Sequence, residues 1–421
     1  MRKGNGIRGL AQTTRTIRDA ENILLRKQTY SCKQCASCRE WNWNDKHLTG
    51  FLPGVTKTGF VICPVYRHAE GFQSDFAEGK VRLVQGLVDG AITASDYLSD
   101  KLFQCTQCAA CTEYCPQARV DKLDPAEVIR AGRGLMVKSG GNQPKEITIM
   151  THRPVKPKPL PTSWIPKVQE YDSDAPLAYF PGCVFGESFK QPSIANSMIS
   201  ILKFLGQPFQ VLTDGWCCGY PSFISGDTAW ATTNAQLVSN RLSELKVKRL
   251  IVSCAWGFRM FSREYPRLLG RSLGVKVLHS AEFLHQELRA GRLQLLKPWH
   301  VVATYHDPCQ LGRRCGVYES PRELVAGIPE LKLVEMLENH EQSLCSGGGG
   351  GVASAYPELG DAIAMTRIKQ AEDVGAQVIL TACPYCRRNL QRGITSAGSK
   401  IEVIDLVEAT AKVLNTEAVE N

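Results

Sequence analysis

Apolar residues recur at helical spacing in the first third of the 421-residue chain. Within residues 76–102, the apolar positions Val81, Val84, Leu87 and Val88 include pairs three and four residues apart. Side chains at this spacing return to one face of an α-helix and bury that face against a neighbour. We therefore expect helices here and a mainly helical domain around them.

From residue 177 the pattern changes to short apolar runs that alternate with amphipathic stretches. It predicts strands at 177–180, 209–212, 249–253 and 275–278, and helices at about 193–205, through Leu237 and Leu242, and from Glu282. Strands that alternate with helices favour a parallel sheet with right-handed crossovers. We expect an α/β domain of this kind.

The same order of elements occurs twice in this part of the chain. Three cysteines recur at offsets of 126, 128 and 129 residues, as the pairs Cys183 and Cys309, Cys217 and Cys345, and Cys254 and Cys383. Near-equal offsets indicate two copies of one domain. The cysteines follow strands, at the sheet edge where ligands bind in open α/β folds.

The composition is that of an ordinary globular protein, with 43% hydrophobic and 22% charged residues. No apolar run approaches the length of a membrane span, and no secretory signal is expected. The net charge of +9 comes from interspersed charges, 50 basic against 41 acidic, so we do not expect nucleic-acid binding. The 17 cysteines change the picture, because clustered cysteines in a large chain without a signal peptide indicate metal binding.

The cysteine spacing between residues 105 and 116 is specific. Cys105, Cys108, Cys111 and Cys115, followed by Pro116, match C-x2-C-x2-C-x3-C-P, the run of bacterial two-cluster ferredoxins. In that run the first three thiolates hold one [4Fe-4S] cluster. The fourth is displaced and binds the neighbouring cluster.

A second group of cysteines lies earlier in the chain and consists of Cys32, Cys35, Cys38 and Cys63. Its spacing is that of the Cys105 group, except that residues 39–62 are inserted before the last cysteine. The crossover rule predicts one [4Fe-4S] cluster on Cys32, Cys35, Cys38 and Cys115, and a second on Cys105, Cys108, Cys111 and Cys63. Zinc and disulfides fit this spacing less well. The insertion is rich in Trp, Asn and Gly, and it is interpreted as a cover for a cluster or as a docking loop.

Four prolines in residues 152–161 indicate an extended linker between domains. The expected fold class is multi-domain α+β, with a helical two-cluster ferredoxin domain followed by two tandem α/β domains with parallel sheets. The expected division is an N-terminal segment at 1–28, the ferredoxin-type domain at 29–145, a Pro-rich linker at 146–175, and α/β domains at 176–299 and 300–421. We call the last two the first repeat and the second repeat.

The repeats resemble the cysteine-rich CCG domain of heterodisulfide reductases. The resemblance rests on the spacing C-x(30-odd)-C-C-G-x(30-odd)-C-x-x-C, and on residues 305–312 and 317–322. It covers roughly residues 29–410. A ferredoxin module followed by two CCG domains is similar to the reductase chain that fuses the C-type and B-type subunits. It is also similar to the iron-sulfur subunits of glycolate, lactate and glycerol-3-phosphate oxidising complexes.

The resemblance implies five cysteines per CCG domain around a non-cubane [4Fe-4S] cluster, and each repeat departs from that set. The first repeat has Cys183, Cys217, Cys218 and Cys254, with Gly257 in the fifth position. The second has Cys309, Cys345, Cys383 and Cys386, with Ser346 in place of the paired cysteine. Four thiolates suit one or two further [4Fe-4S] clusters, cubane or non-cubane, and also zinc. Cys315 and Ser346 are candidate replacement ligands.

Other features of the second repeat have two interpretations. His306 and Asp307 are interpreted as a structural turn or as proton carriers. The glycines at 347–351 lack the Lys-Ser/Thr of a P-loop and favour close backbone approach to a cluster at Cys345. Neither a base–nucleophile pair nor a dinucleotide fingerprint is found, so FAD or NAD is expected on another subunit.

Together these features predict an electron-transfer subunit of a hetero-oligomeric redox complex. The expected partner is a flavoprotein dehydrogenase, an electron-transfer flavoprotein, or a membrane quinone or cytochrome subunit. The expected location is the cytoplasm, with peripheral attachment to the inner face of the membrane left open. The alternatives are a catalytic subunit that reduces a disulfide at a non-cubane cluster, and a scaffold stabilised by zinc in the repeats.

Overall fold

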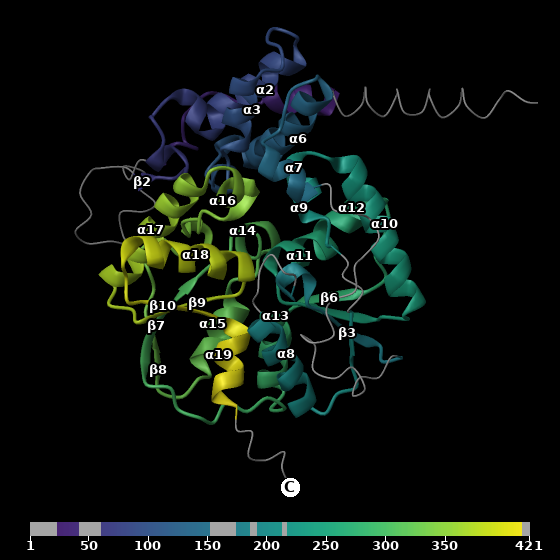
Figure 1. Ribbon diagram of the computed structural model, residues 1–421, viewed down its shortest axis with the longest axis vertical. Coiled ribbons are helices and arrows are strands. Elements are labelled where there is room, and N and C mark those ends of the chain that lie inside the picture. The colour runs from purple at the N-terminus through teal and green to yellow at the C-terminus, as the bar shows by residue number, and fades with distance from the viewer. Residues whose placement is uncertain (1–22, 42–59, 152–173, 186–191, 213–216, 415–421) are drawn as a thin grey trace, which may run out of the picture. The chain divides into compact units, whose positions relative to one another are not determined.

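The computed structural model describes residues 23–41, 60–151, 174–185, 192–212 and 217–414 (Figure 1). The chain forms two units, Met1–Pro144 and Lys145–Asn421. Most of the insertion expected to cover a cluster or to dock a partner, and most of the Pro-rich linker, lie outside the described residues.

The first unit is built mainly of helices. Its elements are β1 (Glu40–Trp41), β2 (Phe60–Val61), η1 (Tyr66–His68), η2 (Gln73–Asp75), α2 (Ala77–Val88), α3 (Asp96–Phe103), α4 (Ala110–Glu113), α5 (Pro116–Val120) and α6 (Pro125–Lys138). Helices α2 and α3 confirm the helical pattern expected at 76–102. Their apolar faces pack on α6, and the shared core includes Val84, Leu102 and Ile129, all fully buried. Gly132 permits the close approach of α2 and α6, because a Cβ there would lie 2.2 Å from Val84 Cγ2.

The fully buried Arg133 connects this core to the start of the Cys105 loop. Its Nε donates to the carbonyl oxygen of Leu102 (3.0 Å), and its Nη2 donates to those of Phe103 (3.4 Å) and Cys105 (2.8 Å). The first two carbonyls belong to the last turn of α3, which has no helical donors for them. One guanidinium therefore closes a helix end and fixes the chain that follows it.

We expect Arg133→Met to destabilise the first unit by about 2 kcal/mol or more, because the carbonyls of Leu102 and Cys105 lose this donor at about 1–3 kcal/mol each. The carbonyl of Phe103 keeps the backbone amide of Cys105 as a donor (2.8 Å). Urea denaturation followed by circular dichroism measures this loss. Lys138→Met, an exposed change on the same helix, is the matched control and should lie within about 0.5 kcal/mol of the native chain. Equal stabilities for the two variants would contradict this role of Arg133.

The second unit contains two four-stranded parallel sheets of the same topology, in the strand orders β4-β3-β5-β6 and β8-β7-β9-β10. The strands are β3 (Leu177–Phe180), β4 (Gln210–Val211), β5 (Arg249–Val252), β6 (Lys276–His279), β7 (Val301–His306), β8 (Leu331–Leu333), β9 (Val378–Thr381) and β10 (Glu402–Asp405). The strands predicted in the first repeat are confirmed at these places, as are the parallel sheets. Figure 1 shows the two sheets on either side of a group of helices.

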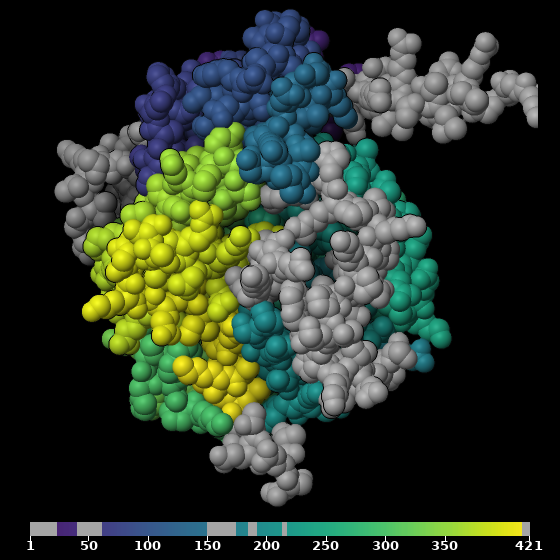
Figure 2. Space-filling view, viewed as in Figure 1, coloured from purple at the N-terminus to yellow at the C-terminus, as the bar shows by residue number. Residues whose placement is uncertain are grey.

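Helices connect the strands and fill the space between the sheets. The first repeat has η5 (Gly182–Phe185), α8 (Pro192–Phe204), α9 (Tyr220–Ser225), α10 (Thr228–Glu244), α11 (Ala255–Arg259), the π-helix η6 (Met260–Glu264), α12 (Tyr265–Leu269) and α13 (Ser280–Arg289). The second has α14 (Gly312–Cys315), α15 (Glu319–Ala326), η7 (His340–Gln342), η8 (Gly349–Gly351), α16 (Val352–Ala355), α17 (Pro357–Asp373), α18 (Pro384–Ala397) and α19 (Leu406–Val413). Helix α8 packs against α19 (Figures 1 and 2), and α13 packs against α15. One hydrophobic core runs through both repeats, so they are two halves of one body.

The second unit begins with a helix that occupies part of the predicted linker. Residues 146–151 of the predicted linker are helical, in α7 (Lys145–Thr151), which packs against α9 and α16. The prolines that favour an extended chain begin only at Pro154, which explains the difference.

Across the described ranges, the helices are too short or too polar to cross a bilayer.

Candidate iron-sulfur sites

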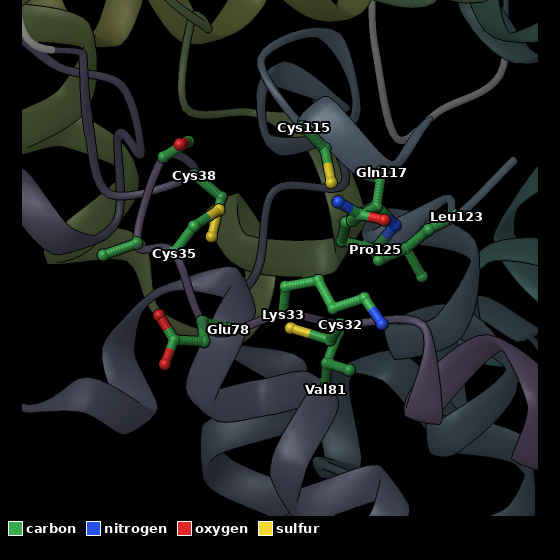
Figure 3. Close-up of a pocket in the computed structure, with 12 residues that line it drawn as sticks. Cys32, Lys33, Cys35, Cys38, Glu78, Val81, Cys115, Gln117, Leu123 and Pro125 are labelled. Atoms are coloured by element: carbon green, nitrogen blue, oxygen red, sulfur yellow. The ribbon is translucent and has the colours of Figure 1, made fainter. Parts of the chain in front are cut away.

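Four cysteines from two segments line one cavity of the first unit. Cys32, Cys35 and Cys38 come from a single loop, and Cys115 comes from the start of α5 (Figure 3). The cavity has a volume of about 340 Å³, counting space open to solvent. In Figure 3, Cys115 approaches it from the side opposite Cys32. The structure thus brings together the four cysteines that the crossover rule assigns to one cluster.

The other four cysteines of this unit line a second cavity of about 370 Å³, again counting open space. Cys105, Cys108 and Cys111 follow α3, and Cys63 approaches from a distant segment. In the described ranges, no three or more cysteine, histidine or carboxylate side chains converge as a single metal ion would require. The four thiols of each cavity are instead distributed around its walls.

The two cysteine loops share an unusual backbone conformation. Gln34 (φ 56°) and Ala36 (φ 56°) in the first loop match Gln107 (φ 55°) and Ala109 (φ 61°) in the second. Residues other than glycine rarely adopt this left-handed conformation, and such strain persists where surrounding structure enforces it. The same turn at two equivalent positions lets each loop curl its three cysteines around one centre. Sequence reasoning did not predict it.

Backbone amides face the cysteine sulfur atoms in both units. The N–H two residues after Cys217 and the N–H two residues after Cys345 each donate to the thiol sulfur over 3.4 Å. In the first unit the amide of Gln34 does so for Cys32, and that of Gln117 for Cys115. Such donors stabilise a thiolate, and so fit a metal-bound sulfur better than a neutral thiol.

Burial opposes thiolate formation at the second cavity unless positive charge compensates for it. Burial raises the pKa of the Cys63 thiol to about 12, although the backbone amide of Tyr66 and the cation of Lys80 both act to lower it. Lys80 is itself buried, and its Nζ donates to the carbonyl oxygen of Gln104 over 2.5 Å. Burial lowers the pKa of Lys80, and the thiols of Cys105 and Cys63 act in the opposite direction. A bound cation would hold these cysteines as thiolates, so the donor set fits an iron-sulfur cluster.

Cysteines of the two repeats come into contact with one another at Cys254 and Cys383. Each follows a strand end: Cys183 after β3, Cys217 and Cys218 after β4, Cys254 after β5, Cys309 after β7, Cys345 after β8, and Cys383 and Cys386 after β9. Across the repeats the thiols of Cys254 and Cys383 hydrogen-bond to each other, which raises the pKa of Cys254 after the larger effect of burial. The Cys386 thiol contacts Cys383 and interacts electrostatically with Cys309. The predicted ligand sets therefore face one another rather than lying at separate surfaces.

Gly257 and Ser346, the residues at which the two repeats depart from the five-cysteine set, lie beside these cysteines. A Cβ at Gly257 would lie 3.8 Å from Cys254 Cβ and 3.9 Å from Cys218 Cβ, so a fifth cysteine there would stand beside the first set. The same Cβ would lie 3.0 Å from Val252 Cγ1, so Val252 would have to move to admit it. Ser346 is buried, and its hydroxyl hydrogen-bonds to the thiol of Cys386. The hydroxyl thus occupies the place next to the second set that a cysteine would take.

Cys315 lies in a different environment. Burial raises the pKa of its thiol to about 11, opposed by the guanidinium of Arg259 and by a hydrogen bond to Ser262. These contacts come from the first repeat. Ligation by Cys315 remains a prediction.

A buried polar network supports the cysteine loops of the second repeat. Asp307, two residues before Cys309, accepts two hydrogen bonds from Arg322 (2.7 and 2.9 Å), and Arg322 also contacts Glu335. Asp307 further accepts from the amide of His340 over 2.9 Å. In the first repeat Pro181 stands where Asp307 stands in the second. Only long-range contacts reveal the structural role of Asp307.

His306 belongs to the same region and is fully buried. Its Nδ1 accepts a hydrogen bond from Nε of Arg367 over 3.2 Å, so the ring is neutral on that side. Burial first, and then the cations of Arg367 and Arg313, lower the pKa of His306 well below its ordinary value. Arg367 also donates to Ser343, two residues before Cys345, and links the two cysteine loops.

This depressed pKa predicts a loss of stability in acid. Below about pH 6.5 the unfolded chain binds a proton at His306 that the folded chain does not, so the free energy of unfolding falls as the pH falls. The loss from this group is about 1.4 kcal/mol per pH unit until the folded pKa is reached. Urea denaturation at pH 7.5 and 5.5 should show a smaller acid loss in His306→Asn than in the native chain. Parallel pH profiles would contradict this assignment.

The comparisons with known proteins agree with this arrangement. The model of the cysteine-rich domain named CCG matches residues 177–261 and 303–391. A crystal structure of a hypothetical protein from Helicobacter pylori shares the fold, with a TM-score of 0.53 at 13% identity over 82% of this chain and 70% of the other.

Relatives in sequence cover most of both units. The chain is 32% identical to the D-type subunit of dihydromethanophenazine:CoB–CoM heterodisulfide reductase from Methanosarcina barkeri, over 91% of this chain and 93% of that protein. It is 27% identical to the probable iron-sulfur-binding oxidoreductase FadF of Bacillus subtilis, over 87% and 55% of the two chains. It is 26% identical to EtfAB:quinone oxidoreductase of Syntrophomonas wolfei, over 75% and 47%. The expected relationship is confirmed: this chain belongs to the family of the D-type subunits of heterodisulfide reductase.

Proposed function

We propose that this protein is an iron-sulfur electron-transfer subunit of a redox complex. Two [4Fe-4S] clusters would be held in a ferredoxin-type domain by the two four-cysteine sets, and one or two more by the cysteines of the repeats. The observation that carries the proposal is the pair of cavities, each lined by three cysteines from one loop and a fourth from a distant segment. This combination matches the ligand crossover of two-cluster ferredoxins.

The residues around the cavities suit this role. When bound, the clusters would accept and release single electrons. The chain supplies thiolates, amide donors to their sulfur atoms, and the buried cation of Lys80 beside Cys63 and Cys105. Fixed donors and cations offset negative charge on the ligands with little rearrangement as that charge changes.

Disulfide reduction is the second candidate function. It is favoured by the relative whose name is that of a CoB–CoM heterodisulfide reductase and by the meeting of Cys254 with Cys383 across the repeats. Against it, Gly257 and Ser346 leave each repeat one thiolate short of the five implied by the CCG resemblance. We therefore favour relay of electrons over cleavage of a disulfide at this site.

Partners of three kinds fit an electron relay. The names of two relatives, a probable iron-sulfur-binding oxidoreductase and an EtfAB:quinone oxidoreductase, support a flavoprotein or a quinone-linked partner. We propose a flavoprotein dehydrogenase, an electron-transfer flavoprotein, or a membrane quinone or cytochrome subunit. The cytoplasm, or the inner face of its membrane, is the proposed location.

The test uses the full chain, purified anaerobically and reduced with a limiting amount of dithionite. Oxidised electron-transfer flavoprotein and the CoB–CoM heterodisulfide are mixed with separate samples, and the absorbance and EPR signals of the clusters are followed. We expect rapid reoxidation by the flavoprotein and none by the heterodisulfide. Reoxidation by the heterodisulfide with release of two thiols would favour the second candidate. Zinc in the repeats would favour a scaffold role for that half of the chain.

A further inference from the structure

A hydrogen bond joins the second repeat to a candidate ligand of the first. The Oη atom of Tyr385 lies 3.2 Å from the Sγ atom of Cys183, 202 residues away in the chain. A metal-bound Cys183 is a thiolate and only accepts hydrogen bonds, whereas a phenol carries one proton to donate. Tyr385 is therefore the donor whenever Cys183 is a ligand.

Aromatic stacking holds the Tyr385 ring in this place. It stacks on Trp256 with ring centroids 3.6 Å apart and an angle of 22° between the planes. Trp256 stacks in turn on Tyr220, at 4.4 Å and 25°. Trp256 and Tyr220 are both buried, so the ring has a fixed support rather than a mobile surface neighbour. The three residues lie in α9, α11 and α18, labelled in Figure 1.

We call the three stacked rings of Tyr220, Trp256 and Tyr385 the aromatic column, and the position of this column follows from the internal repeat. Trp256 stands two residues after Cys254, and Tyr385 stands two residues after Cys383. Equivalent residues of the two repeats therefore stack on each other. Tyr220 directly follows the Cys217-Cys218-Gly219 motif. Tyr220 and Trp256 thus belong to two cysteine segments of the first repeat, and Tyr385 brings a hydroxyl from the opposite repeat to the third, at Cys183.

We propose that Tyr385 is a positioning residue for the cysteine site of the first repeat, where its hydrogen bond to Cys183 raises the reduction potential of the bound cluster. This inference rests on the proposed function, since it requires a cluster at Cys183. A hydrogen bond to a ligand sulfur stabilises the state with more negative charge, which is the reduced state. The second repeat would thereby set the redox properties of the first.

The test is an EPR-monitored redox titration of the full chain carrying Tyr385→Phe. The signal of the first repeat is identified as the one lost in Cys183→Ser. We expect Tyr385→Phe to shift the reduction equilibrium of this signal toward the oxidised state by up to about tenfold, which is a fall of about 59 mV for a one-electron couple. Iron content and the thermal melting curve should stay as in the native chain.

Two further variants make the outcome specific. Tyr220→Phe removes a hydroxyl from the same column without altering the contact with Cys183, and its potential should not change. Tyr385→Leu removes the phenol and the stacked ring together and introduces no donor, and it should shift the potential in the same direction as Tyr385→Phe. The inference is overturned if the potential of Tyr385→Phe is unchanged, or if Tyr220→Phe shifts it equally. Absence of any signal dependent on Cys183 in the native chain would instead overturn the proposed cluster in this repeat.

Discussion

Replacing Cys115 by serine is expected to remove the cluster bound by Cys32, Cys35 and Cys38, and not the cluster bound by the adjacent loop. The reason is that Cys115 lines the cavity of the first set, although it stands only four residues after Cys111 in the chain. Each variant that loses one cluster should lose about four iron atoms per chain. Iron and sulfide analysis of anaerobically purified protein measures the loss.

Pairs of substitutions show which cysteines share a cluster. Cys32→Ser combined with Cys115→Ser should lose no more than about four iron atoms, since both remove one cluster. Cys105→Ser combined with Cys115→Ser should lose about eight. The reverse result, with about eight iron atoms lost from the first pair and about four from the second, would show that each loop binds its own cluster without crossover.

Arg322→Met is expected to destabilise the second unit by about 3–5 kcal/mol, because it leaves Asp307 as a buried carboxylate without its cation. The Asp307 side chain is almost fully inaccessible and accepts both of its short hydrogen bonds to a cation from Arg322. Since Asp307 precedes Cys309 by two residues, iron bound by the second repeat should also fall. Urea denaturation and iron analysis measure the two effects.

The double variant Asp307→Asn with Arg322→Met is the matched control. It removes the charge together with its partner, and an asparagine oxygen still accepts the hydrogen bond from the amide of His340. We expect it to recover at least half of the lost stability, because no unpaired buried charge remains. If the double variant is as unstable as the sum of the two single variants, the ion pair is not the main contribution of Arg322.

Much of the framework of this protein could be predicted from local patterns. Short apolar runs at 177–180 and 249–253 predicted the strands β3 and β5, because a parallel strand buried on both faces is apolar throughout. The near-equal cysteine offsets predicted the internal repeat. The ferredoxin spacing predicted that Cys115 would join the loop that begins at Cys32, and that Cys63 would join the loop that begins at Cys105. The two cavities are lined by these combinations of cysteines.

The contacts between distant segments could not be predicted in this way. Nothing local to Trp256 or Tyr385 indicates that their rings stack, since that contact depends on how two folded domains pack. The left-handed turns at Gln34 and Gln107 also escape sequence rules, which expect glycine at such positions. Residues 146–151 of the helix α7 lay in the segment assigned to the linker, because the prolines further along the chain dominated its interpretation.

Cluster binding by both units is tested by quantitative analysis of iron, sulfide and zinc, with EPR spin quantitation, on the full chain purified without oxygen. We expect about 12 to 16 iron atoms per chain, an equal amount of sulfide, and little zinc. About eight iron atoms with zinc or no metal in the repeats would contradict cluster binding by the second unit, and a chain without iron would contradict it for both units.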